Sequence, residues 1–375
     1  MHSIIKKIFV LLFIIQFIFS FSGCSKNNKP STTDNVPMNK TESKKSVIIV
    51  SSSPESKKQS KYKSGLLLAL RDYKDTTSKT NTYRTLWIAP KGDDIMVITE
   101  GKGILVPYEN DFWYISQQEI KEKNKDFSYF TSYPVLSQKT DNSPQLQEAP
   151  GVSFEFKCNI TFVGNKYLCI DNVNSWKNEN TSYGMVCHEI GVRDINTINE
   201  YNTMFENTNY FSAKDAFGDK IVPFIEKIAE EKVPDGYVNV QEMNGHNWAI
   251  SRNKGKWIPH LANNILRGNT YSNYILKDIP LEMPKSIVSY DELTPDWNTI
   301  KKAVPDATDA VSSPSKDMLA VFTSGKLSIY VNPLNGITKP VLSIPIEKNE
   351  SMIMDQWAVG DYVNKWTTEI SKYLK

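Results

Sequence analysis

Histidine is scarce in this sequence, and the motifs that usually carry enzyme chemistry are missing. Of its four histidines, three lie beyond the N-terminus, at His188, His246 and His260, in separate segments without HExxH or CxxC spacing. There is no GxSxG nucleophile elbow, no Walker loop and no dinucleotide-binding glycine fingerprint. The sequence therefore predicts no catalytic residue, no metal site and no cofactor. It favours a non-enzymatic role without deciding that question.

Cysteine is equally rare. The four residues are Cys24, Cys158, Cys169 and Cys187. The last three cannot all pair within one chain. If the apolar runs on either side of Gly164-Asn165 form a hairpin, Cys158 and Cys169 face the same side on a diagonal. That arrangement allows a disulfide, and three buried reduced thiols are an equal alternative.

The tripeptide Cys187-His188-Glu189 brings a nucleophile, a base and an acid together in sequence. Adjacent residues of a strand point to opposite faces, however. The tripeptide is therefore not expected to act as a catalytic group.

Net charge is small, but it is unevenly spread. The chain carries a formal charge of +2, and removal of the first 23 residues, with Lys6 and Lys7, brings it to zero. Residues 25–63 contain nine lysines against three acidic residues. Such a stem either favours anionic headgroups and wall polymers or serves as a solvated linker. The remainder has no basic face, which argues against a nucleic-acid partner.

Long apolar runs are absent except near the N-terminus. Lys6 and Lys7 precede an apolar run of about 14 residues, whereas a transmembrane helix needs roughly 20. This layout is typical of an export signal, and it makes a permanent membrane span the weaker interpretation.

The end of that run, Phe21-Ser22-Gly23-Cys24, resembles the bacterial lipobox, with Phe21 in place of the usual aliphatic residue. The resemblance implies cleavage before Cys24 and lipidation of that cysteine. The protein would then be anchored by lipid on the extracytoplasmic face of the cell membrane. An ordinary secretory signal with an incidental cysteine is the alternative.

Composition and periodicity divide the chain into four segments. Residues 1–23 are the signal, and residues 24–80 are a lipidated, disordered basic stem. Its apolar runs 47–50 and 66–70 are expected at most to dock as a short edge strand or helical turn. Residues 81–293 form an α+β domain, and residues 294–375 form a β-meander with a C-terminal helix.

The α+β domain begins with a meander of short strands over residues 85–115. Residues 116–150 are polar and interrupted by prolines, so they are expected to form a surface excursion. Ser212 and Asp215 resemble a capping box that starts an amphipathic helix ending near Lys232. A further strand is expected at 286–290.

Two resemblances refine this fold. The phrases at 210–217, 248–258 and 286–293 are similar to the extracytoplasmic domain of lysozyme-sensing anti-sigma factors and to modules attached to peptidoglycan deacetylases. Residues 312–321 resemble the opening of a β-propeller blade, and Val363, Trp366 and Ile370 mark one face of a last helix. The predicted fold class is mainly β (α+β), with antiparallel meanders or a sandwich, one amphipathic helix and a blade-like C-terminal unit. An incomplete β-propeller is the alternative.

These features favour a binding or sensing module for a cell-envelope component. The expected partners are the membrane, through the lipid anchor, and a cell-wall polymer or a secreted protein such as a lysozyme. A cell-envelope enzyme or enzyme accessory subunit is the alternative. Among eight tryptophans, most of which suit a core, Trp176 lies between polar residues and is the candidate ligand-contacting aromatic.

Overall fold

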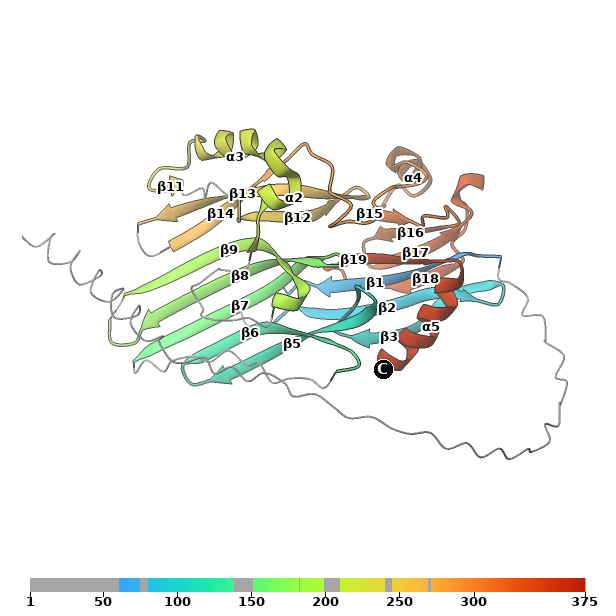
Figure 1. Cartoon of the computed structure of the whole chain (residues 1–375), viewed down its shortest axis with the longest axis horizontal. Coiled ribbons are helices and arrows are strands. Elements are labelled where there is room, and N and C mark those ends of the chain that lie inside the picture. Colours follow the sequence, from blue (N-terminus) through green and yellow to red (C-terminus); the bar gives the residue numbers. More distant parts are fainter. Residues whose placement is uncertain are drawn as a thin grey trace, which may run out of the picture. The chain divides into compact units, whose positions relative to one another are not determined.

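Short apolar runs separated by turns give the chain a mainly β structure, which confirms the predicted fold class (Figure 1). The structure is a computed structural model that describes residues 61–74, 80–137, 151–181, 183–198, 210–239, 245–268 and 271–374. All of these belong to the unit formed by residues 57–375. Cys24, the export signal and the apolar run 47–50 lie outside the described residues.

Three sheets make up this unit. The middle sheet consists of β1 (Ser64–Asp72), β2 (Thr82–Lys91), β3 (Asp94–Lys102) and β19 (Glu350–Val359), in the order β19-β1-β2-β3. The C-terminal sheet is the meander of β15 (Asp309–Ser312), β16 (Met318–Thr323), β17 (Lys326–Val331) and β18 (Leu342–Pro345).

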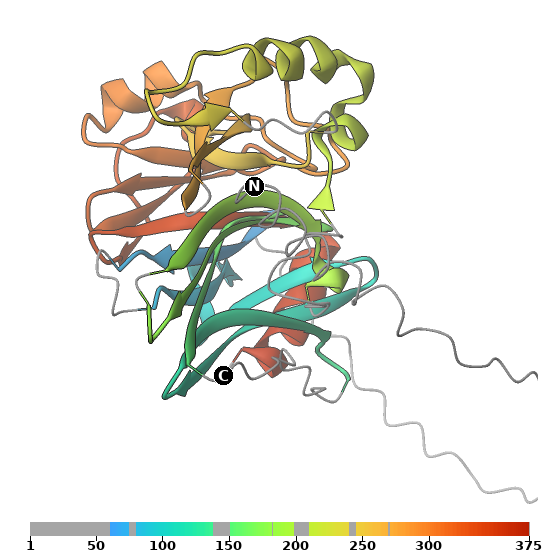
Figure 2. The same ribbon diagram turned by 90° about the vertical axis from the view of Figure 1, so that its left-hand side faces the viewer.

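The large sheet has eleven strands, several of which bend along their length (Figure 2). They are β4 (Ile104–Tyr108), β5 (Asp111–Glu122), β6 (Lys125–Pro134), β7 (Val152–Val163), β8 (Tyr167–Asn178), β9 (Gly184–Asp194), β10 (Tyr210–Phe211), β11 (Val238–Asn239), β12 (Trp248–Asn253), β13 (Lys256–Arg267) and β14 (Tyr271–Asp278). Their order is β11-β13-β14-β9-β8-β7-β6-β5-β4, with β10 paired to β9 and β12 paired to β13. No sheet closes on itself within the described ranges.

The described residues contain few helices, and these are short. They are η1 (Ile195–Thr197), α2 (Ala213–Phe217), η2 (Gly218–Ile221), α3 (Val222–Ala229), α4 (Trp297–Ala303), η3 (Pro333–Asn335) and α5 (Asp361–Tyr373). None of the helices in the described residues is long and apolar enough to cross a bilayer.

Strand β1 is buried on both faces. Leu66 to Leu70 are fully inaccessible to solvent. One face of the middle sheet shares a core with β4 to β8 and α5, and the other face shares a core with the C-terminal sheet. The expectation of a stem reaching residue 80, with this run at most an edge strand, is therefore wrong. β1 is an interior strand between β19 and β2.

The polar stretch 116–150 is not simply a surface excursion. It begins inside β5, and β6 follows with residues 127–132 buried. In β6, the buried Ser128 and Ser132 are interspersed with buried aromatic residues, which makes this strand look polar in sequence. These serines are satisfied by hydrogen bonds, since Ser132 donates to the carbonyl of Ile195 at 2.5 Å and Ser128 accepts from Gln117 at 3.0 Å.

The hairpin predicted around Gly164-Asn165 is confirmed by the antiparallel pairing of β7 and β8. A β-bulge between Ile160 and Phe162 changes which face each residue takes. As a result Cys158 packs in the core beneath the middle sheet, whereas Cys169 packs in the core beneath the helices. The predicted diagonal is therefore wrong, and Cys158, Cys169 and Cys187 are not joined to one another by disulfides.

The predicted helix from residue 213 is interrupted. Ser212 and Asp215 form the expected capping box at the start of α2. Gly218 then adopts φ +64°, a conformation that suits glycine, and α2 and α3 are separate elements. The strand expected at 286–290 is also wrong, because Ile287 and Val288 both donate backbone hydrogen bonds to the Pro284 carbonyl and form a turn.

The end of the chain returns to the middle sheet. The C-terminal sheet matches the predicted meander, but β19 pairs with β1 and α5 packs on β2 and β3. Val363 and Ile370 are buried in that core, and the ring of Trp366 lies 5.8 Å from that of Trp87. The boundary expected at residue 294 therefore separates strands of one sheet.

A buried ion cluster joins all three sheets. Arg252 on β12 donates from Nε and Nη2 to both carboxylate oxygens of Asp309 on β15, at 3.0 Å each. Its Nη1 donates to Asp291 at 3.3 Å. Trp257 Nε1 donates to Asp355 on β19 at 3.0 Å, and the Trp257 backbone N–H donates to Asp291 at 2.9 Å. Three carboxylates thus surround one guanidinium where the sheets meet.

Candidate functional site

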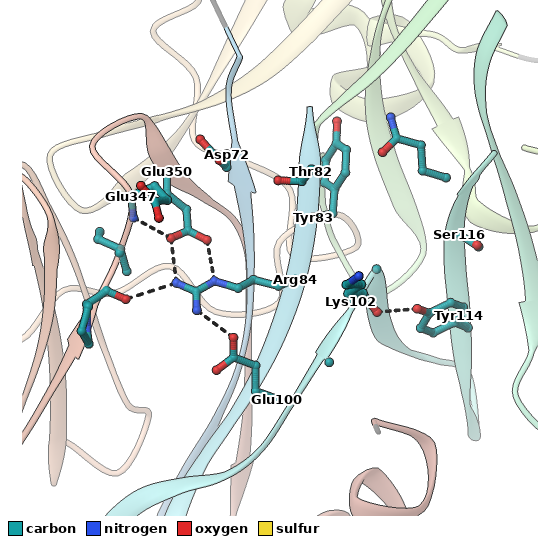
Figure 3. A pocket seen from close by; sticks show the side chains of 15 residues that line it. Asp72, Thr82, Tyr83, Arg84, Glu100, Lys102, Tyr114, Ser116, Glu347 and Glu350 are labelled. Carbon is teal, nitrogen blue, oxygen red and sulfur yellow. Dashed lines mark hydrogen bonds and ion pairs between the residues drawn. The ribbon is translucent and has the colours of Figure 1, made fainter. Parts of the chain in front are cut away.

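A polar cavity of about 970 Å³ lies at one end of the middle sheet (Figure 3). Strands β1, β2 and β3 form its floor, the β18–β19 connection forms one wall, and β5 forms the other. The lining residues are Asp72, Thr82, Tyr83, Arg84, Glu100, Gly101, Lys102, Gly103, Tyr114, Ser116, Gln117, Pro345, Ile346, Glu347 and Glu350. Hydrogen-bonding side chains predominate, so the cavity suits a polar ligand.

Strand register brings the charged residues together. Asp72 lies opposite both Glu350 and Thr82, in one row across β19, β1 and β2. In the next row Leu70 lies opposite Arg84, and Arg84 lies opposite Lys102. Leu70 belongs to the core shared with the C-terminal sheet. The cavity therefore begins where that core ends.

Arg84 is the central group of the cavity, held between two glutamates (Figure 3). Its Nε and Nη2 donate to the two oxygens of Glu350 at 2.6 and 2.7 Å, and Nη1 donates to Glu100 at 2.7 Å. A longer bond of 3.3 Å runs from Nη2 to the carbonyl of Pro345. The hydrogen bonds that Arg84 donates to Glu350 are the main reason that the pKa of Arg84 is raised. The Glu350 side chain is 3% exposed, so Arg84 compensates a charge that is almost fully buried.

The remaining charges differ in how far they are neutralised. Asp72 forms an ion pair with Lys74. Glu347 is exposed, and its backbone contacts Glu350: its N–H donates to the Glu350 carboxylate at 3.0 Å, and its carbonyl accepts from the Glu350 N–H at 3.0 Å. The ammonium of Lys102 makes no ion pair with any described residue.

The β5 wall is held rigidly in place. Tyr114 donates from its hydroxyl to the Lys102 carbonyl, and Gln117 donates to Ser128 at 3.0 Å. The tyrosine approaches Gly103 so closely that any side chain at residue 103 would collide with its ring, and the φ of +78° there also favours glycine. Burial raises the pKa of Tyr114. This hydroxyl therefore acts as a hydrogen-bonding group and not as an acid.

The lining offers ionic and hydrogen-bonding groups. It contains neither histidine nor cysteine. Tyr83 is buried, burial raises its pKa, and its hydroxyl accepts from the backbone N–H of Ile160 at 3.1 Å. What the cavity offers to a ligand is ionic and hydrogen-bonding contact on a preformed frame.

Trp176, the predicted ligand-contacting residue, lies elsewhere, near the end of β8 in the large sheet. It is half-buried, and it pairs across the sheet with Phe154 and Met185. Its ring meets that of Tyr183 edge to face at 5.3 Å, and Tyr183 is 55% exposed. The two rings form a partly open aromatic ledge that does not line the cavity. A ligand-binding role for Trp176 stays a prediction.

The side chains of Cys187 and His188 contact different groups, as expected of neighbouring residues on a strand. Cys187 contacts Glu189 and Ser272, each at 3.1 Å, whereas His188 contacts Asp171 at 2.7 Å. Burial, with a contribution from Glu189, raises the pKa of Cys187 to about 12, so the thiol stays protonated. Burial lowers the pKa of His188, the Asp171 contact raises it, and the balance is a raised value.

The described residues also contain no group of three or more histidine, cysteine, aspartate or glutamate side chains that could hold a metal ion. No protein-family model, no curated protein and no solved structure matches this chain. The sequence did not indicate the cavity, because its central ion pair joins residues 84 and 350. The only local signal was an arginine directly before the apolar run 85–89.

Proposed function

We propose that this chain is a lipid-anchored, extracytoplasmic binding module for a cell-envelope component, and that the cavity around Arg84 is its ligand site. The observation that carries the proposal is a preformed polar cavity of about 970 Å³, with Arg84 fixed between Glu350 and Glu100. Rigid polar groups of this kind recognise ligands without the cost of ordering flexible side chains. The export signal and lipobox-like ending at Cys24 support a location outside the membrane.

The test uses the soluble mature chain carrying Cys24→Ser, with cell-wall fragments released by muramidase as the probe. Isothermal titration calorimetry should detect saturable binding. Thr82→Trp places a large ring at an exposed position of the cavity lining and should abolish the heat of binding. Ser343→Trp is the matched control, because Ser343 is an exposed strand residue of β18 outside the lining.

Two outcomes would overturn the proposal. One is the absence of saturable binding to wall fragments. The other is equal binding by wild type, Thr82→Trp and Ser343→Trp, because a ligand held in this cavity cannot tolerate the first substitution.

A further inference from the structure

The balance of charge around the cavity restricts what it can bind. The lining supplies four carboxylates, from Asp72, Glu100, Glu347 and Glu350, against the two cations of Arg84 and Lys102. Lys74 offsets one carboxylate through its pair with Asp72. The cavity is therefore acidic overall, and an acidic cavity attracts cations.

The central cation is not available to an anion. Glu350 occupies two N–H groups of Arg84, Glu100 occupies a third, and the Pro345 carbonyl lies within reach of a fourth. A phosphate or carboxylate would have to displace Glu350, which would leave a nearly buried carboxylate without its partner. Lys102 is then the one cationic side chain of the lining that a ligand anion could meet without breaking a described contact.

Several acceptors of the lining remain accessible to a ligand. The Glu347 carboxylate is exposed, Glu100 is 45% exposed at its side chain, and the Lys102 carbonyl receives one hydrogen bond, from Tyr114. An ammonium group supplies three donors and no acceptor, which complements this set. Its hydrogen bonds to carboxylates are charge-assisted and about twice as strong as neutral ones.

We propose that the cavity recognises its ligand through a protonated primary amine, which pairs with one of the two exposed carboxylates of the lining, Glu100 or Glu347. This inference rests on the proposed function, and it names the chemical class of the ligand. An envelope polymer can present such a group on an unacetylated amino sugar or on the side chain of a lysine-type peptide. The acetylated forms of both lack the charge and two of the three donors.

The experiment compares two pairs of probes by calorimetry on the soluble mature chain. One pair is a glucosamine trisaccharide and its N-acetylated counterpart, and the other is a lysine-containing tripeptide and its Nε-acetyl form. The amine member of at least one pair should bind more tightly than its acetylated counterpart by about tenfold or more, because a charge-assisted contact is lost on acetylation. The pair that shows the difference identifies the source of the amine.

Three variants locate the contact. Glu100→Gln with Glu347→Gln should weaken amine binding by about tenfold and weaken binding of the acetylated probe by less, because only the amine loses a charge-assisted contact. Lys102→Gln should strengthen amine binding, because it removes a competing cation. Glu226→Gln with Glu230→Gln, exposed on and just after α3, changes the net charge equally and should have no effect.

The inference fails if acetylated and amine probes bind equally, if no amine probe binds, or if the α3 control weakens binding as much as the cavity variants. The proposed function is judged separately by wall fragments and Thr82→Trp. Wall fragments that bind in the cavity while both amine probes do not would therefore refute the amine and leave the binding function standing.

Discussion

The buried cluster around Arg252 should make this protein more stable in mild acid than in mild base. Burial raises the pKa of Asp355 to about 6 and that of Asp291 to about 7, in spite of Arg252 and, for Asp291, the backbone N–H of Trp257. One guanidinium, bound at short range to Asp309, cannot neutralise three carboxylates. Lys256 lowers the pKa of Asp291 only slightly. Bound protons therefore compensate the excess negative charge of the cluster.

The sign of the effect follows from these shifts. A carboxyl whose pKa is raised on folding binds more protons in the folded state, so its contribution is fully present below about pH 4 and is lost as the pH rises through the folded pKa. For Asp355 the shift is from 3.8 to about 6. That corresponds to about 3 kcal/mol, of which roughly half is still present at pH 5.

Asp355→Asn tests this account, because the amide has the shape of the protonated acid and can still accept from Trp257 Nε1. At pH 8 the variant should be more stable than wild type by about 3 kcal/mol, a rise of roughly 5 °C in melting temperature. At pH 5 the gain should fall to about half. Differential scanning calorimetry at both values measures it.

The control is Asp219→Asn, because the side chain of Asp219 is 93% exposed. This substitution should change the melting temperature at pH 5 and at pH 8 by no more than about 1 °C. A variant at residue 355 that melts below wild type at pH 8 would refute the reasoning. A gain that is the same at pH 5 and pH 8 would refute it as well, because the stabilisation would then have no connection with proton binding.

Three further predictions concern the architecture and the anchor. A chain that begins at Thr80 lacks β1, with the fully buried residues 66–70, and should show no cooperative transition in urea; a melting midpoint equal to that of the mature chain would contradict this. Trp366→Ala removes a ring packed 5.8 Å from Trp87 and should cost about 2–3 kcal/mol in urea unfolding, whereas an unchanged midpoint would mean that α5 contributes little. Cys24→Ser should move the protein from the membrane fraction to the soluble fraction and abolish labelling by a palmitate analogue, and labelling that survives would rule out lipidation at this residue.

Elements with local signals were predicted well from the sequence. The capping box at Ser212, the hairpin at Gly164-Asn165 and the packing face of the last helix are each encoded within a dozen residues. The capping box and the hairpin are satisfied by neighbours in the chain, and the helix carries its apolar periodicity in its own sequence, so the pattern alone identifies them. These elements include none of the residues that line the cavity.

The run at 66–70 was misjudged because it is buried on both faces. A strand with one solvent face alternates apolar and polar residues, whereas a doubly buried strand is continuously apolar and carries no periodicity. The lysine- and serine-rich sequence before it then favoured a stem. Pairing with the distant strand β19, on the side opposite β2, shows that this run is the interior strand of a sheet.

The prediction that Cys158 and Cys169 face the same side of the hairpin failed for a different reason. Successive residues of a strand lie on alternate faces, so one extra residue moves every residue beyond it to the opposite face. The bulge after Ile160 inserts such an extra residue, and no glycine marks this position in the sequence. Predictions of which side chains share a face are therefore sound only within an unbroken ladder.

The cavity depends on changes from apolar to charged residues that occur at the same end of three strands, and no single segment of the sequence shows this. Along one face, β1 changes from Leu70 to Asp72, β19 changes from Met352 to Glu350, and β2 changes from Leu86 to Arg84. Each change alone is typical of a strand reaching solvent. Because pairing brings all three to one end of the sheet, the apolar core is replaced there by a connected set of charges, and Arg84 can bind the almost buried Glu350. A sequence shows where each strand changes, and only the register shows that the three changes form one site.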